Sequence, residues 1–175
     1  HSEMKALVYT STQQSEIRNV ELPIVSDRQS VIEIEFCGIC GSDMHAWHGH
    51  DERRIPPLVL GHEAVGLAIS GPHTGKRVAI NPLMTCGQCL VCISGNEHLC
   101  AARELIGMRV PGAFAEQVAI NNKNLIKISD NLSSENAALA EPLACAVNAV
   151  NQAARHTAEK DARIVVLGGG AIGLL

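Results

Sequence analysis

The chain has 175 residues, of which 46% are hydrophobic and only 2% aromatic, and its formal net charge is −4. This length allows one domain and part of a second, with a core built mainly from aliphatic side chains. The acidic balance excludes the basic surface of a nucleic-acid-binding protein. No apolar run approaches the roughly 20 residues that span a membrane, so no membrane partner is predicted either.

Short apolar or alternating runs, separated by Gly, Pro and polar turns, occupy most of the N-terminal part. They predict strands over residues 5–10, 17–22, 30–37, 63–70, 76–80 and 113–120. A short helix is expected after the third strand, capped by Ser42 and ending near His48, because a serine hydroxyl can bond the free amides at a helix start. Many short strands joined by such turns are typical of a closed or partly closed β-barrel.

A cysteine cluster interrupts this pattern in a loop expected to be irregular. Its members are Cys86, Cys89, Cys92 and Cys100. This spacing can bring four thiolates to the corners of a tetrahedron about 2.3 Å from a zinc ion. Protein would fill all four positions, so the predicted site is structural. A disulfide framework is the alternative, and the odd total of seven cysteines disfavours it.

The pattern becomes helical from residue 133 onward. Pro142 stands where a helix can begin. The apolar residues that follow recur on one helical face, at Leu143, Val147, Val150 and Ala154. A helix leading into the last segment is therefore expected.

The last residues combine an apolar run with spaced glycines. Ile164–Leu167 predicts a strand, and Gly168, Gly170 and Gly173 follow it directly. Glycines spaced in this way after a strand allow the tight turn and the close pyrophosphate approach of a dinucleotide site. The acidic residue expected about 20 positions later lies outside this sequence, so a longer protein is expected. A flexible glycine-rich tail is the alternative.

Two other segments carry chemically active side chains. The first places a thiol, a hydroxyl, a carboxylate and an imidazole close together, at Cys40, Ser42, Asp43 and His45. The second is His62–Glu63, which on its own could be an ordinary strand start. A thiolate, an imidazole and a carboxylate or water are acceptable zinc ligands. A zinc ion with an open position can favour the deprotonated form of an alcohol, and a hydroxyl beside an imidazole could pass the proton to solvent.

Together these motifs resemble the zinc-dependent medium-chain alcohol and polyol dehydrogenases, in that family's order. The matching segments are Gly38–His45, Gly61–Gly66, the cysteine loop, Gly112–Glu116 and Glu141–Leu143. The resemblance implies a mostly β fold with a chaperonin-10 (GroES)-like β-barrel catalytic domain over residues 4–140, including a structural-zinc lobe over 81–105. Residues 141–175 would hold the connecting helix and the first strand and glycine turn of an α/β Rossmann domain, the rest of which is absent from this sequence.

The resemblance also implies two zinc ions per chain. The structural zinc would be held by the four cysteines of the loop. The catalytic zinc would be surrounded by Cys40, His62, Glu63 and Glu141, and whether Glu141 or water completes its shell stays open. Cys145, one helical turn after Glu141, is an alternative ligand, although a packed thiol is the simpler interpretation.

Further roles follow from the same resemblance. Asp43 would orient His62, as partners of metal-binding imidazoles commonly do. Ser42 and His45 would relay the alcohol proton to solvent, and Glu63 is counted with them as a catalytic residue. The three glycines of the last turn would bind NAD or NADP.

The implied activity is transfer of a hydride from a secondary alcohol to NAD(P)⁺. Simple alcohol dehydrogenases carry a cysteine at the position of Glu141, whereas Glu141–Leu143 is similar to the sorbitol and butanediol dehydrogenase branch. A polyol, sugar alcohol or sugar acid is therefore the expected substrate. A threonine-type or simple secondary alcohol dehydrogenase, or a non-catalytic zinc-stabilised relative, is the alternative. A cytoplasmic homodimer or homotetramer is expected.

Overall fold

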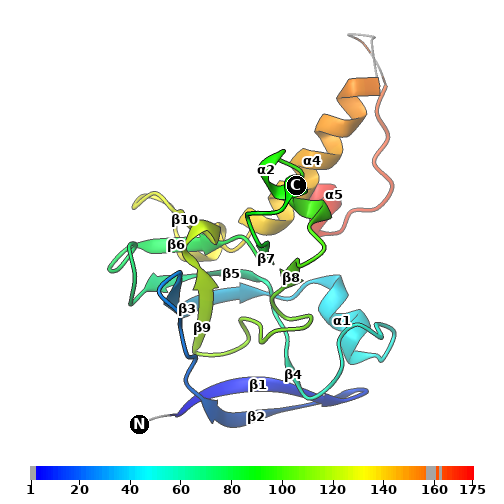
Figure 1. The fold of residues 1–175 in the computed structure, drawn as a ribbon. Coiled ribbons are helices and arrows are strands. Elements are labelled where there is room, and N and C mark those ends of the chain that lie inside the picture. The colour runs from blue at the N-terminus through cyan, green and yellow to red at the C-terminus, as the bar shows by residue number, and fades with distance from the viewer. Residues whose placement is uncertain (1–2, 157–160, 162) are drawn as a thin grey trace.

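The computed structural model describes residues 3–156, 161 and 163–175, and strands dominate it (Figure 1). The strands are β1 (Glu3–Ser11), β2 (Gln14–Glu21), β3 (Gln29–Gly38), β4 (Leu58–Val59), β5 (Glu63–Ala68), β6 (Arg77–Ile80), β7 (Leu83–Met84), β8 (Glu104–Leu105), β9 (Gln117–Asn121) and β10 (Leu125–Lys127). The helices are α1 (Gly41–Trp47), α2 (Leu90–Ile93), α3 (Ser134–Ala137), α4 (Ala140–His156) and α5 (Ala171–Leu174), with the 3₁₀ turns η1 (Glu97–Leu99) and η2 (Asn122–Asn124).

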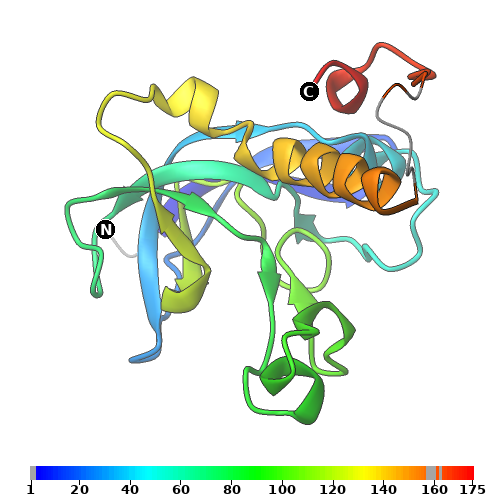
Figure 2. The ribbon, with the colours of Figure 1, turned by 90° about the horizontal axis from the view of Figure 1, so that it is seen from above.

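Two antiparallel sheets form a partly closed barrel, which confirms the predicted architecture. The larger sheet has the order β10-β6-β5-β3-β9 and the smaller β2-β1-β4. Residues 113–116 join them, because the Leu7 amide donates to the Phe114 carbonyl at 2.8 Å and the Ile34 amide donates to the Glu116 carbonyl at 2.9 Å. Seen from above, the larger sheet curls around the core (Figure 2).

Alternating side chains along the strands fill the barrel. In β3, Ser30 and Ile32 are buried while Glu33 and Glu35 are exposed, as the period of two in a strand requires. Aliphatic residues from several strands and loops make up the main core, among them Ile32, Val78, Ile80, Ile106, Val118, Ile120 and Leu125. Removal of this apolar surface from water is the dominant force that holds the sheets together.

The pairing of β3 with β5 brings two distant segments to one end of the barrel. Its register shifts between Ile34 and Phe36, so that Gly38 lies opposite Glu63. A bulge of this kind redirects the residues beyond it. As a result, the chain that leaves β3 meets the chain that enters β5.

The cysteine loop forms a lobe that projects from the barrel (Figure 2). β7 and β8 pair at its base, with Leu83 opposite Leu105. The Asn124 side chain donates to the carbonyls of Asn81 and Leu83 at 2.9 and 2.7 Å. The structure adds the short helices α2 and η1 to a loop predicted to be irregular.

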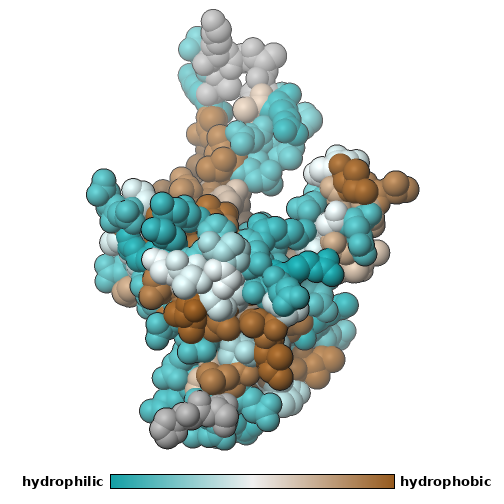
Figure 3. Space-filling model, turned by 60° about the vertical axis from the view of Figure 1, so that its left-hand side comes forward, coloured by the Kyte–Doolittle hydropathy of each residue, from teal (hydrophilic) through white to brown (hydrophobic). Residues whose placement is uncertain are grey.

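The long helix α4 begins on the barrel and extends away from it (Figure 1). Pro142 and Ala146 are buried, but the predicted apolar face is not, because Leu143, Val147 and Val150 are 42%, 49% and 66% exposed. In the space-filling view, apolar side chains are exposed in the upper part of the molecule, where this helix and the segment that follows it lie (Figure 3). The helix is confirmed, while its apolar face is only partly covered by the described residues.

Several predicted boundaries in the barrel are wrong: β2 starts at Gln14 and not at 17, β5 ends at Ala68 and not at 70, and the starts of α1 and β9 also differ. α1 begins at Gly41 with Cys40 as its N-cap, not Ser42, because the Asp43 carboxylate accepts a hydrogen bond from the Cys40 amide at 3.1 Å. The strand predicted over 113–120 is β9, which starts only at Gln117, since the residues before it cross between the two sheets.

The strand predicted over Ile164–Leu167 does not form. The four side chains are 64% to 94% exposed, and no strand among the described residues pairs with them. A strand needs such a neighbour to bond its amides and carbonyls. The predicted turn into a helix does form, with Gly170 as the N-cap of α5. None of the helices in the described part of the chain has the length and apolar character to traverse a bilayer.

Candidate metal centres and proton-transfer residues

Cys40, His62 and Glu63 converge where β3 leads into α1 and where β5 begins. One ligand atom from each lies within 4.8 Å of the other two. His62 and Glu63 are buried, at 5% and 8% exposure, and Cys40 is half-buried. Three of the four predicted ligands of the catalytic zinc are therefore brought together from two separate segments.

Two positions beside this cluster require glycine. A Cβ on Gly38 would lie 2.3 Å from Glu63 Oε2, so any side chain there would displace the carboxylate. Gly61 has a φ of +92°, and a Cβ on it would lie 2.6 Å from the Phe114 ring. Only glycine adopts such a φ without cost. The glycines that flank the reactive residues in the sequence thus serve the geometry of the site.

The carboxylate of Asp43, 2% exposed, links the two segments. It accepts hydrogen bonds from the amides of Cys40 at 3.1 Å and Gly61 at 3.3 Å, and its Oδ1 lies 3.5 Å from His62 Nδ1. Burial lowers the pKa of His62, but Asp43 and the neighbouring carboxylates raise it, and the net shift is upward. Asp43 therefore stands where an orienting partner of His62 is expected.

The donor set of this cluster suits zinc. A thiol, an imidazole and a carboxylate are ordinary zinc ligands, and three protein ligands with an open fourth position are typical of catalytic sites. His62 Nδ1 is buried without a hydrogen-bond partner within the described residues, and the nearby Asp43 could supply the carboxylate that usually orients a metal-binding imidazole.

Glu141, the fourth predicted ligand, lies at the margin of the cluster. It stands in the first turn of α4 and outside the compact group of Cys40, His62 and Glu63. Burial raises its pKa, the charge of His62 lowers it and that of Glu63 raises it, with a net upward shift, so Glu141 is within electrostatic reach of the site. Cys145 is exposed and donates a hydrogen bond to Glu141 Oε1 at 3.7 Å, also outside the compact group.

The four cysteines of the lobe form a second cluster. Their sulfur atoms are 3.4 Å apart for Cys89–Cys92, 3.6 Å for Cys86–Cys100, 3.9 Å for Cys86–Cys92 and 4.0 Å for Cys89–Cys100. In a tetrahedral site with Zn–S bonds of about 2.3 Å, neighbouring sulfurs are about 3.8 Å apart. All four are free thiols. The geometry therefore fits a structural zinc and not a disulfide framework.

The surroundings of the lobe include features that the sequence did not reveal. The backbone amides of Gln88 and Cys89 lower the pKa of Cys86 to about 6, which favours its thiolate. Lys123, next to β9, donates to Thr85 Oγ1 at 2.7 Å and to Glu97 Oε1 at 3.1 Å. Lys123 thus connects the lobe to the barrel by hydrogen bonds. No local sequence pattern predicts this role.

Ser42 and His45 lie one helical turn apart on α1 and border the same hollow, of about 480 Å³. Ser42 is half-buried and His45 is exposed, so the burial of the two side chains decreases from the hydroxyl to the imidazole. The Ser42 hydroxyl accepts a hydrogen bond from Arg54 Nη2 at 3.3 Å. Sequence reasoning missed Arg54, because this loop arginine belongs to no spaced motif or periodic run.

The three glycines of the last turn also come together. Gly168 has a φ of +104°, and a Cβ on Gly173 would lie 2.1 Å from the Gly168 carbonyl oxygen. A Cβ on Gly170 would meet nothing within 4 Å. The first and last glycines therefore close the turn, while the middle one leaves its surface open, as the spacing predicts for a dinucleotide site.

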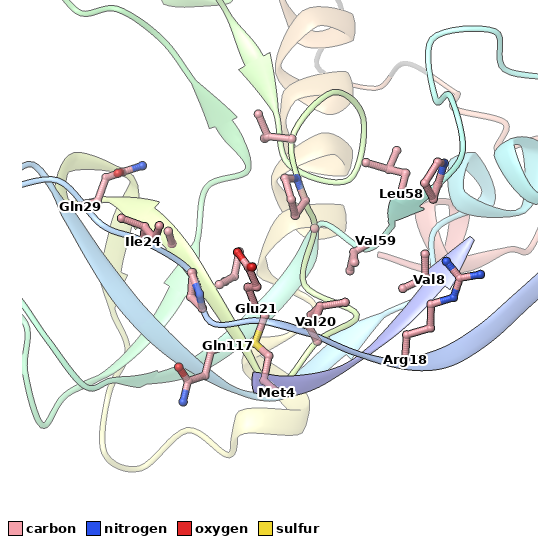
Figure 4. A pocket seen from close by; sticks show the side chains of 18 of the residues that line it. Met4, Val8, Arg18, Val20, Glu21, Ile24, Gln29, Leu58, Val59 and Gln117 are labelled. Atoms are coloured by element: carbon pink, nitrogen blue, oxygen red, sulfur yellow. The ribbon is translucent and has the colours of Figure 1, made fainter. Parts of the chain in front are cut away.

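A separate hollow of about 590 Å³ lies beside the smaller sheet (Figure 4). Apolar side chains line much of it, among them Met4, Val20, Ile24 and Val59. It contains none of the predicted ligands or relay residues, so the geometry assigns no chemistry to it.

The fold and both clusters agree with the comparison to known proteins. Residues 26–130 match the alcohol dehydrogenase GroES-like domain, and the chain belongs to this family. It is 34% identical to L-galactonate-5-dehydrogenase of Escherichia coli K12, covering 99% of this chain and 52% of that protein. It is 33% identical to the sorbitol dehydrogenase of Bacillus subtilis, covering 98% of this chain and 51% of that protein.

A solved structure is similar to this chain in fold as well as in sequence. An E. coli CFT073 alcohol dehydrogenase, RspB, crystallised with NADH, superposes with a TM-score of 0.80 at 30% identity, covering 87% of this chain and 46% of that one. The chain thus spans about half the length of the proteins it matches.

Proposed function

We propose that the protein is a zinc-dependent oxidoreductase that transfers a hydride from a secondary alcohol to NAD⁺ or NADP⁺. The convergence of Cys40, His62 and Glu63 within 4.8 Å of one another carries this proposal. The similarity to L-galactonate-5-dehydrogenase and sorbitol dehydrogenase supports a polyol, sugar alcohol or sugar acid as the substrate, and the NADH of the RspB structure supports the cofactor.

In this proposal the residues at the end of the barrel have separate roles in zinc binding and proton transfer. Cys40, His62 and Glu63, with Glu141 at the margin, would hold a zinc ion, which when bound favours the deprotonated form of an alcohol. Asp43 orients the imidazole of His62. The Ser42 hydroxyl accepts the alcohol proton while giving up its own, and His45 passes that proton to water.

The remaining parts of the proposal concern the rest of the protein. Residues 4–140 form the catalytic domain, with the lobe over 81–105 around a second, structural zinc. Residues 141–175 begin the dinucleotide-binding domain, in which Gly168, Gly170 and Gly173 approach the cofactor. The free thiols of the seven cysteines suit a reducing cytoplasm, and the assembly is a homodimer or homotetramer.

A substrate panel tests the activity directly. The complete, zinc-loaded protein is assayed with NAD⁺ and NADP⁺ against polyols, sugar acids, L-threonine and simple secondary alcohols. Highest kcat/KM on a polyol or sugar acid is the expected result. Preference for L-threonine would overturn the substrate class, and inactivity with every alcohol would overturn the enzyme.

Replacement of His45 tests the proton relay. His45→Gln should lower kcat about tenfold or more near neutral pH, because a positioned acid–base group typically contributes roughly 10²–10⁴-fold and a group at the solvent side lies at or below the low end. Activity should recover in part at higher pH, where hydroxide accepts the proton from Ser42. The matched control is His48→Gln, since His48 is a neighbouring exposed imidazole. A His45→Gln enzyme with an unchanged pH–rate profile would remove His45 from the relay.

A further inference from the structure

A buried arginine contacts the relay serine, and the proposed function gives it no role. Arg54 lies in the loop after α1, and its side chain is 1% exposed. A cation is rarely buried so completely without partners that compensate its charge. The buried guanidinium group of Arg54 is therefore expected to have hydrogen-bond partners that compensate its charge.

The partners of Arg54 come from three parts of the chain. Its Nη1 pairs with Asp51 Oδ2 within the same loop, and its Nε donates to the Gly107 carbonyl at 2.9 Å. Its Nη2 donates to Ser42 Oγ at 3.3 Å. Asp51 and Gly107 thus fix two edges of a rigid planar group, and the third edge is presented to Ser42.

The anchor at Gly107 is itself held close to the metal-ligand segment. Gly107 has a φ of +72°, and a Cβ on it would lie 3.0 Å from the amide nitrogen and the carbonyl oxygen of Gly61. Gly61 directly precedes the candidate ligand His62. Through Gly107, Arg54 connects α1 to the segment that carries His62, in addition to the link that Asp43 makes.

The hydrogen-bonding capacity of a hydroxyl shows what such a contact does. A serine hydroxyl has one proton to donate and two lone pairs to accept with, whereas a guanidinium group only donates and stays protonated. With Arg54 on one lone pair, Ser42 keeps one lone pair for the alcohol proton and one O–H for the next acceptor. Arg54 cannot take the proton itself, so it can only restrict the rotation of the hydroxyl.

We infer that Arg54 is the positioning residue of the proton relay: it holds Ser42 Oγ so that one proton enters from the alcohol as another leaves toward His45 or water. The inference rests on the proposed function. No net charge accumulates on Ser42, because the O–H bond that forms replaces the one that breaks. The hydride leaves the same alcohol for the nicotinamide.

A double-mutant cycle in the complete protein tests this role. Arg54→Gln should lower kcat about tenfold, less than the roughly 10²–10⁴-fold of a group that itself transfers the proton, and should change KM less than twofold. In a Ser42→Ala background the same change should alter kcat less than twofold, because its target is gone. An equal loss of kcat in both backgrounds would show a purely structural role and overturn the inference. An unchanged kcat in both backgrounds would also overturn it.

Two further variants keep the test decisive. Arg54→Gln should fold, since Asp51 keeps a second partner, Arg53, at 2.8 Å. If it does not fold, Arg54→Lys replaces it, because lysine retains the charge but cannot span all three partners. Arg54→Lys should then lower kcat in the parent protein and not in the Ser42→Ala background. Arg53→Gln is the matched control, because Arg53 binds the same carboxylate but has no contact with Ser42 in the described hydrogen bonds. A kcat loss for Arg53→Gln equal to that for Arg54→Gln would contradict the inference.

A measurement without catalysis separates this inference from the proposed function. In ¹⁵N NMR spectra, the Arg54 guanidinium resonances, assigned by their loss in Arg54→Gln, should shift in Ser42→Ala while those of Arg53 stay in place. Unchanged Arg54 resonances would overturn the contact, whether or not the protein oxidises alcohols. A shift in a protein inactive with every alcohol would support the contact and overturn the proposed function, and with it the relay role.

Discussion

If the proposed zinc site beside His62 is correct, Cys40→Ser is expected to release that zinc and to abolish nearly all of the proposed activity while the barrel stays folded. Cys40 is the only thiol of the cluster formed with His62 and Glu63, and a serine hydroxyl does not replace a thiolate as a zinc ligand. Changes to groups that merely support a metal ligand cost roughly 10–100-fold in affinity or activity, so loss of the ligand itself should cost more than about 100-fold.

Metal analysis and circular dichroism check this result. The variant should contain one zinc per chain instead of two, with an unchanged spectrum. Cys145→Ser is the matched control, because its thiol lies near Glu141 but outside the compact cluster. Full metal content and activity in Cys40→Ser would rule out Cys40 as a ligand, whereas loss of zinc in Cys145→Ser would restore Cys145 as the alternative ligand.

Cys92→Ser is expected to remove the other zinc and to destabilise the lobe. Cys92 is buried and lies 3.4 Å from Cys89 and 3.9 Å from Cys86. Because zinc binding and folding are coupled, the free energy of unfolding should fall on the order of several kcal/mol. Thermal unfolding monitored together with zinc content would show this loss, and the zinc at Cys40 should remain.

A matched change in the same lobe separates metal loss from general loosening. Lys123→Ala removes the hydrogen bonds to Thr85 and Glu97 but no ligand, so it should cost only about 1 kcal/mol and keep both zinc ions. A Cys92→Ser protein that retains two zinc ions and the stability of the parent would contradict the structural-zinc assignment.

The contrast between the two clusters explains how far the sequence alone could reach. The four lobe cysteines lie within one loop, so their spacing was enough to predict a tetrahedral site. Cys40 meets His62 only because the bulged pairing of β3 with β5 places Gly38 opposite Glu63. No local pattern encodes that register, and here the resemblance to a family supplied what spacing could not.

The strands were predictable where side-chain alternation is strong. β3, predicted over 30–37, runs over Gln29–Gly38, because buried and exposed side chains alternate there. Ile164–Leu167 has equally suitable residues but no neighbouring strand among the described ones, and composition cannot supply a hydrogen-bond partner. The cap of α1 was misplaced because a carboxylate three residues further on, Asp43, bonds back to the Cys40 amide.

Arg54 and Lys123 mark the limit of pattern-based reasoning. Each fixes a functional segment through a single side chain whose partners are remote in sequence, such as Gly107 for Arg54 and Thr85 for Lys123. Neither residue belongs to a periodic run or a spaced motif. Only the folded arrangement reveals them.

Anomalous X-ray diffraction at the zinc edge, on crystals of the complete zinc-loaded protein, tests the two-zinc account most directly. Two peaks per chain are expected, one among the four lobe sulfurs and one bounded by Cys40, His62 and Glu63. A single peak, confined to the lobe, would contradict the account and leave the barrel as a zinc-stabilised domain without a catalytic metal.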